Sequence, residues 1–187
     1  MSKLTMPTYI FDKVENIPFE LLEEKKIKGI MFDLDNTLAN YSGHINKEKL
    51  DWIKEAKRRG IKICIVSNSH RQTKIRPIMM ELDIQGLNYA MKPLLRGYIY
   101  ALDLLGVKKE NACMIGDQIF TDIVGANRFG IMSILVKPVG IVEEMWVKMK
   151  RPLEKVVIAK YHKKHKKDKE NDSEVKEDNK KNKRNKK

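Results

Sequence analysis

The sequence lacks most of the features that mark secreted or membrane-spanning proteins. It has only two cysteines, Cys64 and Cys113, and each lies within an apolar run, which favours buried thiols over a disulfide or a metal pair. No apolar run approaches the ~18 residues of a transmembrane helix, and the amino terminus has no apolar core of a signal peptide. These absences predict a cytoplasmic protein, and they leave open a peripheral attachment to the inner face of the membrane.

Charge is plentiful but unevenly distributed. The 187 residues carry a formal net charge of +13. Residues 148–187 hold 17 Lys and Arg against 7 Asp and Glu, whereas residues 1–147 hold 21 against 18. The basic excess therefore belongs to a tail, whose charge is compatible with an anionic phospholipid membrane surface, with nucleic acid, or with no partner. Residues 161–187 contain too few apolar side chains to form a core, so we expect this segment to be disordered.

Apolar runs alternate with helical patterns through residues 28–160. Strands are predicted at about residues 29–32, 61–66, 87–91, 112–115 and 131–136. Helices are predicted between them at 47–59, 71–82, 94–105 and 119–129, and a last one at about 143–159, which Pro152 would interrupt or restart. This alternation implies right-handed crossovers and predicts a single α/β domain, with a doubly wound, mainly parallel sheet.

Residues 1–27 precede this domain as an apolar, aromatic-bearing lead. Pro7 and Pro18 break the segment, and a short helix is predicted at 21–27. We expect the lead to be a flap that covers the edge of the sheet, because scattered apolar residues on a surface need no special explanation. The alternative is an entrance for lipid.

Two carboxylates follow the first predicted strand. Asp33 and Asp35 are two residues apart, so a regular strand would place both side chains on one face. Two like charges at that separation need a cation or a shared proton. Carboxylates of this kind suit Mg²⁺, which also binds substrate phosphate. Without further partners, the same residues would simply be a strand end followed by an Asp-Asn turn.

Polar residues also follow the later strands. Ser67 and Asn68 come after the second, Lys92 after the third, and Asp117 after the fourth. Each of these alone has an ordinary explanation as a turn or a surface lysine. Because the carboxyl ends of parallel strands meet at one edge of a sheet, we expect these residues to converge beside Asp33.

Such a convergence predicts phosphoryl-transfer chemistry. Asp33 can attack phosphorus and form an acyl-phosphate, and Asp35 can protonate the leaving oxygen and later deprotonate water. The Ser67 hydroxyl, Asn68 and backbone amides can hold phosphate oxygens. Lys92 can neutralise charge on the phosphate and on the nucleophile.

The same residues predict a metal site. Asp33, Asp117 and the main-chain carbonyl of Asp35 can hold Mg²⁺ together with water. Asp122 follows Asp117 by five residues and has two possible roles: it can bind the metal, or it can orient Asp117 and Lys92.

The order of these motifs resembles that of the haloacid-dehalogenase-like (HAD) phosphatases. Asp33–Thr37 is similar to the DxDx(T/V) signature of the family, and Ser67, Lys92 and Gly116-Asp117 with Asp122 are similar to its second, third and fourth motifs. The resemblance covers residues 28–137. It implies that Asp33 is the nucleophile, that Asp35 is the general acid and base, and that Mg²⁺ is the cofactor.

The spacing of the motifs leaves no room for a cap domain, which many HAD enzymes insert between them. Only 31 residues separate Asp35 from Ser67, and 24 separate Ser67 from Lys92. A member without a cap has an open cleft. Such a cleft is suited to large substrates that themselves shield the site from water, such as a protein, a nucleic acid or a lipid headgroup at a membrane surface.

Asp33–Leu38 and residues 116–130 further resemble the YqeG-type class IIIA phosphatases, which are related to mitochondrial phosphatidylglycerophosphate phosphatase. This resemblance implies hydrolysis of phosphatidylglycerophosphate in phospholipid biosynthesis. Two alternatives remain open: a HAD phosphatase that acts on a phosphoprotein, a nucleotide or a nucleic-acid end, and a non-enzymatic module that binds RNA or the ribosome.

Overall fold

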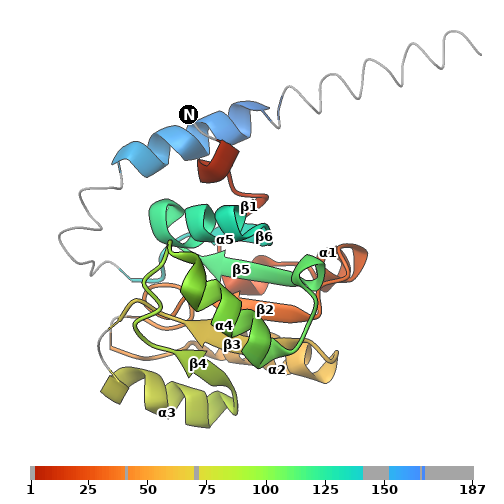
Figure 1. Cartoon of the computed structure of the whole chain (residues 1–187), viewed down its shortest axis with the longest axis vertical. Coiled ribbons are helices and arrows are strands. Elements are labelled where there is room, and N and C mark those ends of the chain that lie inside the picture. The colour runs from red at the N-terminus through yellow and green to blue at the C-terminus, as the bar shows by residue number, and fades with distance from the viewer. Residues whose placement is uncertain (1–2, 41, 70–71, 141–151, 165, 167–187) are drawn as a thin grey trace, which may run out of the picture. The chain divides into compact units, whose positions relative to one another are not determined.

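The computed structural model describes residues 3–40, 42–69, 72–140, 152–164 and 166 (Figure 1). The chain divides into two units, Met1–Lys148 and Met149–Lys187. The strands of the first unit are β1 (Tyr9–Phe11), β2 (Gly29–Phe32), β3 (Lys62–Val66), β4 (Gln85–Leu87), β5 (Ala112–Gly116) and β6 (Met132–Val136). Its α-helices are α1 (Phe19–Glu24), α2 (Lys47–Arg58), α3 (Gln72–Leu82), α4 (Leu95–Leu105) and α5 (Val124–Phe129).

The six strands form one sheet in the order β1-β6-β5-β2-β3-β4, and every pair is parallel. The predicted doubly wound α/β fold is thereby confirmed. The chain passes from β2 to β3 on one side and later returns to β5 on the other side of β2. The carboxyl end of β2 is therefore the point where the strand order reverses, which is where open parallel sheets bind their ligands.

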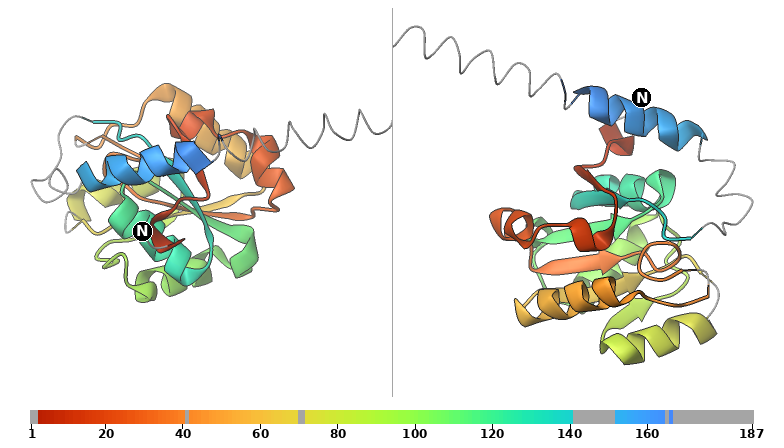
Figure 2. Two further views of the ribbon diagram at one scale, coloured as in Figure 1. Left: turned by 90° about the horizontal axis from the view of Figure 1, so that it is seen from above. Right: turned by 180° about the vertical axis from the view of Figure 1, so that it is seen from behind.

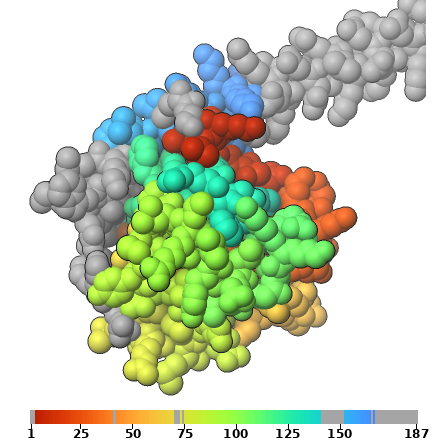
Figure 3. Space-filling model, viewed as in Figure 1, coloured from red at the N-terminus to blue at the C-terminus, as the bar shows by residue number. Residues whose placement is uncertain are grey.

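Each face of the sheet has its own hydrophobic core. One core joins α1, α2 and α3 to alternate strand residues such as Phe32 and Ile65. The other joins α4 and α5 to the intervening residues, such as Met31 and Met114. Figure 1 shows α4 and α5 over the near face, and the view from behind in Figure 2 shows α2 over the opposite face. In the space-filling view the side chains of α4 hide the strands behind them (Figure 3). Because both faces are covered, the central strands β2 and β5 are buried along their whole length and have no alternating polar residues.

The lead before β2 is part of the sheet, so its predicted role as a flap over the edge is wrong. Tyr9–Phe11 pairs in parallel with β6, with Tyr9 opposite Ile134, and forms the edge strand itself. Further along the lead, Phe19 stacks on Trp52 of α2 with ring centroids 5.0 Å apart. Backbone hydrogen bonds and aromatic packing therefore attach the lead to the domain. The apolar composition of the lead does not predict either of these contacts.

Two other predicted elements differ from the structure. The strand expected at residues 87–91 is β4, which ends at Leu87, because the chain must turn back there to bring Lys92 over the sheet edge. In the following loop Tyr89 and Met91 adopt left-handed conformations, with φ of 54° and 52°, and the Lys92–Pro93 peptide is cis. The helix expected at 119–129 has two parts, a π-helical turn η4 (Ile119–Ile123) and then α5.

The second unit contains a helix over residues 152–164. Pro152 is the first residue of this helix among the described residues. Residues 161–164 belong to this helix although the sequence predicts disorder there, whereas 143–151 and 167–187 lie outside the described residues. No helix of the described part is long and apolar enough to span a membrane.

Candidate active site

The carboxyl edge of the sheet brings together the polar residues that follow the strands. Asp33 follows β2, Ser67 follows β3, and Asp117 follows β5, while the loop after β4 supplies Lys92. All four side chains are buried, with 5% or less of their surface exposed. Lys92 Nζ lies 2.5 Å from Asp33 Oδ1, although 59 residues separate the two in sequence. The predicted convergence is therefore what the structure shows.

A tight turn after β2 positions the two aspartates of the first motif. The backbone N–H of Leu38 donates to the Asp33 carbonyl, and that of Ala39 donates to Leu34, at 3.3 Å and 3.0 Å. Asn36 adopts a left-handed conformation with φ of 63°, which asparagine tolerates better than most residues. Asp35 lies in this turn, half-buried, rather than on a regular strand beside Asp33.

Lys92 is held by both its side chain and its backbone. Its ammonium contacts Asp122 Oδ1 at 2.7 Å in addition to Asp33. The side chain of Asn68 accepts from the Lys92 N–H at 2.7 Å and donates to the Lys92 carbonyl at 3.0 Å. Burial alone would lower the pKa of Lys92, but Asp122 and Asp33 raise it further, so the net shift is upward and the lysine stays protonated. Asn68 thus positions Lys92, and its role in phosphate binding stays a prediction.

Asp122 is a partner of Lys92 and is fully buried. Its second oxygen, Oδ2, accepts from the Gln118 N–H at 3.1 Å within the π-helical turn. The Tyr98 hydroxyl lies 3.1 Å from the main-chain carbonyls of both Thr121 and Asp122. Of the two roles predicted for Asp122, these contacts favour the one that orients Lys92. Sequence reasoning missed Tyr98, since an aromatic residue at helical spacing resembles an ordinary core residue.

Three carboxylates form the group that could hold a metal ion. Ligand atoms of Asp33, Asp117 and Asp122 lie within 4.8 Å of one another. Asp33 Oδ2 is buried and has no hydrogen-bond partner among the described residues. Burial and the neighbouring Asp122 and Asp117 raise the pKa of Asp33 well above its usual value, against the opposing effect of Lys92. A bound divalent cation would give this oxygen a partner and favour the ionised form, so the residues fit a metal.

Asp117 has a hydrogen bond of its own within the site. Its Oδ1 accepts from the Thr37 hydroxyl at 3.2 Å, across 80 residues of sequence. Thr37 belongs to the first motif and is fully buried. Its hydroxyl therefore connects the turn that carries Asp35 to the carboxylate after β5.

Gly116 leaves no space for a side chain beside Asp122. A Cβ atom at this position would lie 2.3 Å from Asp122 Oδ2, which is closer than atoms can approach. We expect Gly116→Ala to displace the Asp122 carboxylate and thus Lys92, and to lower, at least about tenfold, the phosphatase activity that the sequence predicts. Phosphate release from an aryl phosphate measures the effect. Gly29→Ala is the control, because its Cβ meets Val107 and Leu105 at the amino end of β2, and it should lower the melting temperature but retain activity. Full activity of Gly116→Ala would contradict the role given to Asp122.

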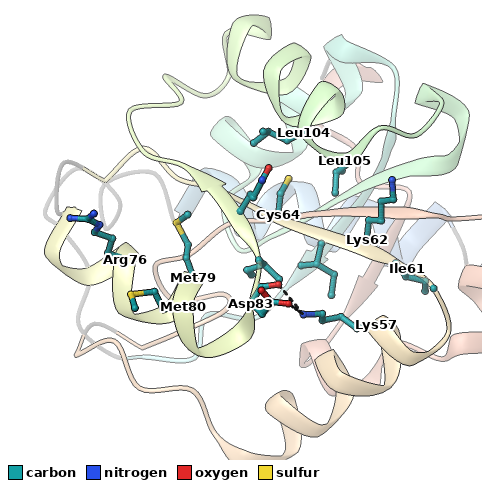
Figure 4. Close-up of a pocket in the computed structure, with 14 residues that line it drawn as sticks. Lys57, Ile61, Lys62, Cys64, Arg76, Met79, Met80, Asp83, Leu104 and Leu105 are labelled. Atoms are coloured by element: carbon teal, nitrogen blue, oxygen red, sulfur yellow. Dashed lines mark hydrogen bonds and ion pairs between the residues drawn. The ribbon is translucent and has the colours of Figure 1, made fainter.

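A large hollow lies away from these carboxylates. It has a volume of about 870 Å³ and is lined by the beginnings of β3 and β4 together with parts of α2, α3 and α4. Figure 4 shows Lys57 directed at Asp83, with Met79 and Met80 on the α3 side. Lys62 opens β3 and Ser67 follows its end, so the hollow and the carboxylates lie at opposite ends of this strand. The hollow is therefore not part of the candidate active site.

Comparison with known proteins agrees with this geometry. The family model of the haloacid dehalogenase-like hydrolases matches residues 43–130, which include Ser67, Lys92, Asp117 and Asp122. Over 165 residues the chain is 32% identical to the probable phosphatase YqeG of Bacillus subtilis, covering 88% of this chain and 95% of that protein. A structure of an uncharacterized protein from Corynebacterium glutamicum has a TM-score of 0.50 at 17% identity, covering 70% and 93% of the two chains, which shows the shared fold.

A second curated relative is longer than this chain. Phosphatidylglycerophosphate phosphatase 1, chloroplastic/mitochondrial, of Arabidopsis thaliana is 30% identical over 172 residues, covering 87% of this chain and 49% of that protein. The chain therefore spans about half the length of this relative.

The parallel sheet, the buried carboxylates with their lysine, and these similarities together define a haloacid-dehalogenase-like hydrolase, and the chain belongs to that superfamily. It is an enzyme, a phosphatase of the HAD type. Within the superfamily its similarity to YqeG over nearly the whole of both chains places it in the family of YqeG-type phosphatases.

Proposed function

We propose that this phosphatase is Mg²⁺-dependent, forms a phosphoryl-enzyme intermediate on Asp33, and hydrolyses phosphatidylglycerophosphate. One observation carries the chemistry: the buried Asp33 has one oxygen on the Lys92 ammonium and a second oxygen that has no hydrogen-bond partner within the described part of the chain, in a group with Asp117. The substrate is proposed from the similarity to the Arabidopsis phosphatase and from the short spacing between the motifs, 31 residues between Asp35 and Ser67 and 24 between Ser67 and Lys92.

The proposed reaction has two displacements at phosphorus. In the first, Asp33 attacks the phosphorus, the bond to the leaving oxygen breaks, and Asp35 gives that oxygen its proton. In the second, water loses a proton to Asp35 and attacks the same phosphorus, which releases inorganic phosphate and restores the Asp33 carboxylate. Lys92 neutralises charge on Asp33 and on the phosphate oxygens. Asp33 and Asp117 would hold Mg²⁺, which when bound balances the negative charge of nucleophile and phosphate.

The connections between strands support a headgroup substrate. Apart from the motif-one turn, the described part of the connection from β2 to β3 contains α2, and that from β3 to β4 contains α3. The described residues of these two connections form no further folded element that could close over Asp33. A phosphate on a lipid headgroup would thus reach the site directly from a membrane surface.

A phosphate-release panel tests this substrate against the alternatives. The panel presents phosphatidylglycerophosphate in mixed micelles, phosphopeptides, nucleotides and 3′-phosphorylated oligonucleotides, each with and without Mg²⁺. We expect the lipid to have the highest kcat/KM, by at least about tenfold. If a phosphopeptide or a nucleic-acid end is preferred, the lipid proposal is wrong while the phosphatase assignment is unaffected. The family assignment leaves the non-enzymatic RNA-binding alternative without support.

Removal of a ligand tests the proposed metal site. We expect Asp117→Ala to raise the Mg²⁺ concentration needed for half-maximal activity about tenfold or more, because it removes one of few protein ligands. The measurement is a Mg²⁺ titration of aryl phosphate hydrolysis. Asp103→Ala, on α4, is the control, because it removes one negative charge as Asp117→Ala does but lies outside the candidate metal site. An unchanged Mg²⁺ requirement in Asp117→Ala would show that Asp117 is not a ligand.

The basic tail is a separate proposal, as most of it lies outside the described residues. We propose that residues 163–187 attract the enzyme to anionic membranes, where each Lys or Arg near the surface contributes about 1 kcal/mol. Deletion of this segment should leave aryl phosphate hydrolysis unchanged, and it should reduce sedimentation with anionic vesicles at low salt. The protein must be treated with nuclease first, because RNA would compete. Equal sedimentation of both forms would favour nucleic acid as the partner of the tail.

A further inference from the structure

A buried lysine behind the first motif has no place in the proposed reaction. Lys49 belongs to the first turn of α2, and only 2% of its surface is exposed. Its ammonium donates to the main-chain carbonyl of Thr37 at 2.5 Å. A lysine on a folded domain normally keeps its charged end in water, so this position calls for an explanation.

The position of Lys49 is unfavourable for the helix and for the charge. The amino end of a helix repels cations, because the backbone N–H groups there carry partial positive charge. Burial lowers the pKa of Lys49 to about 8, with Glu15 opposing the shift and Lys13 adding to it. Neither effect is needed to form α2, whose start is already capped by Asn46, which accepts from the Lys49 N–H at 3.2 Å. The lysine therefore carries a cost that the stability of the helix does not explain.

Thr37 makes the contact that connects Lys49 to the site. Its carbonyl accepts from Lys49, and its hydroxyl donates to Asp117 Oδ1 at 3.2 Å. One buried residue thus contacts the lysine through its backbone and the candidate metal ligand through its side chain. A fixed carbonyl limits rotation of the Thr37 peptide and keeps the hydroxyl directed at Asp117.

A small network in turn positions Lys49. Glu15, on the 3₁₀ turn η2 (Val14–Asn16), accepts from the Asn46 side chain at 3.2 Å. A pocket of about 480 Å³ lies beside these groups, lined among others by Glu15, Thr37 and Lys49. The Lys49 ammonium therefore has a hydrogen bond to the Thr37 carbonyl and feels the favourable charge of the Glu15 carboxylate.

We propose that Lys49 is a positioning residue that holds Thr37, and through it Asp117, in the geometry that binds the metal. The inference rests on the proposed Mg²⁺ site and deepens it. Lys49 would act through its hydrogen bond to the Thr37 carbonyl and not on the substrate phosphate itself. Groups that orient a metal ligand typically change metal affinity by 10–100-fold when they are removed.

The test is a double-mutant cycle between Lys49→Met and Thr37→Val, with Mg²⁺ binding measured by calorimetry in the absence of substrate. Methionine keeps the length of the lysine stem and removes the donor. Lys54→Met is the matched control, because Lys54 is an exposed lysine on the same helix. Melting curves select a temperature at which every variant is folded.

We expect Lys49→Met to weaken Mg²⁺ binding about tenfold and Lys54→Met to leave it unchanged. In the Thr37→Val background, Lys49→Met should have little further effect, because the hydroxyl that transmits its influence is absent. A merely structural lysine would instead lower the melting temperature without changing Mg²⁺ affinity in the folded protein. Unchanged affinity in Lys49→Met, or independent and additive effects of the two substitutions, would overturn the proposal.

Two further variants keep the outcome decisive. If Lys49→Met does not fold, Lys49→Gln replaces it in the cycle, because glutamine retains a polar end but reaches less far. Lys49→Arg keeps the cation, and the neighbouring pocket offers it space, so it should retain most of the Mg²⁺ affinity. Failure of the wild-type protein to bind Mg²⁺ would refute the proposed metal site itself, which distinguishes that failure from a failure of the role of Lys49.

Discussion

Asp33→Asn is expected to abolish phosphatase turnover in a protein that still folds. The amide oxygen of asparagine is a poor nucleophile, so the acyl-phosphate on residue 33 cannot form. The expected loss of kcat exceeds about 10⁴-fold, which is typical of removing the group that forms the covalent intermediate. Lys92 retains Asp122 as a partner at 2.7 Å, so the substitution leaves no isolated buried cation.

The same substitution should not destabilise the protein when metal is absent. The pKa of Asp33 is raised in the folded state, so above its usual value of 3.8 the folded state binds more protons than the unfolded state. The contribution of Asp33 to the free energy of unfolding is therefore most favourable at low pH. It decreases as the pH rises from 3.8 through the raised pKa of the folded state, so the ionised carboxylate destabilises the fold above that pKa. Asparagine removes this cost. We expect an equal or higher melting temperature without Mg²⁺ and a smaller increase on adding it.

Single-turnover assays with a radiolabelled phosphate ester test both points. They measure the rate of phosphate release and the amount of phosphoryl-enzyme that carries the label, and we expect Asp33→Asn to lose both. Asp51→Asn, an exposed aspartate on α2, controls for the chemical change alone. Near-wild-type turnover of a folded Asp33→Asn protein would contradict the assignment of the nucleophile. A lower melting temperature without Mg²⁺ would show that the ion pair with Lys92 outweighs the cost of burial.

Asp35→Asn should show a rate loss that depends on the leaving group. An alkoxide from a lipid headgroup is a poor leaving group and needs a proton as its bond to phosphorus breaks. An activated aryl oxide leaves without that help. General acid catalysis contributes roughly 10²–10⁴-fold, so we expect a loss of this size on an alkyl or lipid phosphate and a smaller loss in the transfer step on an aryl phosphate.

Burst kinetics separate the two steps of this reaction. With an aryl phosphate, Asp35→Asn should retain a rapid burst of the aryl alcohol and then hydrolyse the phosphoryl-enzyme slowly, because water has lost its general base. The melting temperature should change little, since Asp35 is half-buried within a turn that backbone hydrogen bonds hold. Equal losses on both substrates, without a burst, would argue against general acid catalysis by Asp35.

The sequence by itself determined the fold class and which polar residues lie at the carboxyl edge of the sheet. The alternation of apolar strands and helices requires a parallel sheet, and in such a sheet residues that follow the strands must share one edge. Asp33, Ser67 and Asp117 each come directly after a strand, so local pattern alone was enough to place them. Lys92 was found although the strand before it was predicted at residues 87–91 and lies at 85–87, because the turn after β4 brings Lys92 back to Asp33.

The tertiary structure alone decided which partners these residues contact. No local pattern shows that Asn68 binds the Lys92 backbone, that Asp122 contacts the Lys92 ammonium, or that Tyr98 supports Asp122. The same holds for Lys49, which a helical pattern places on α2 without indicating whether its ammonium reaches water or Thr37. Periodicity specifies which face of an element is apolar. The partner of a buried polar group depends on side chains far apart in sequence, which meet only when the sheet has formed and water has been excluded.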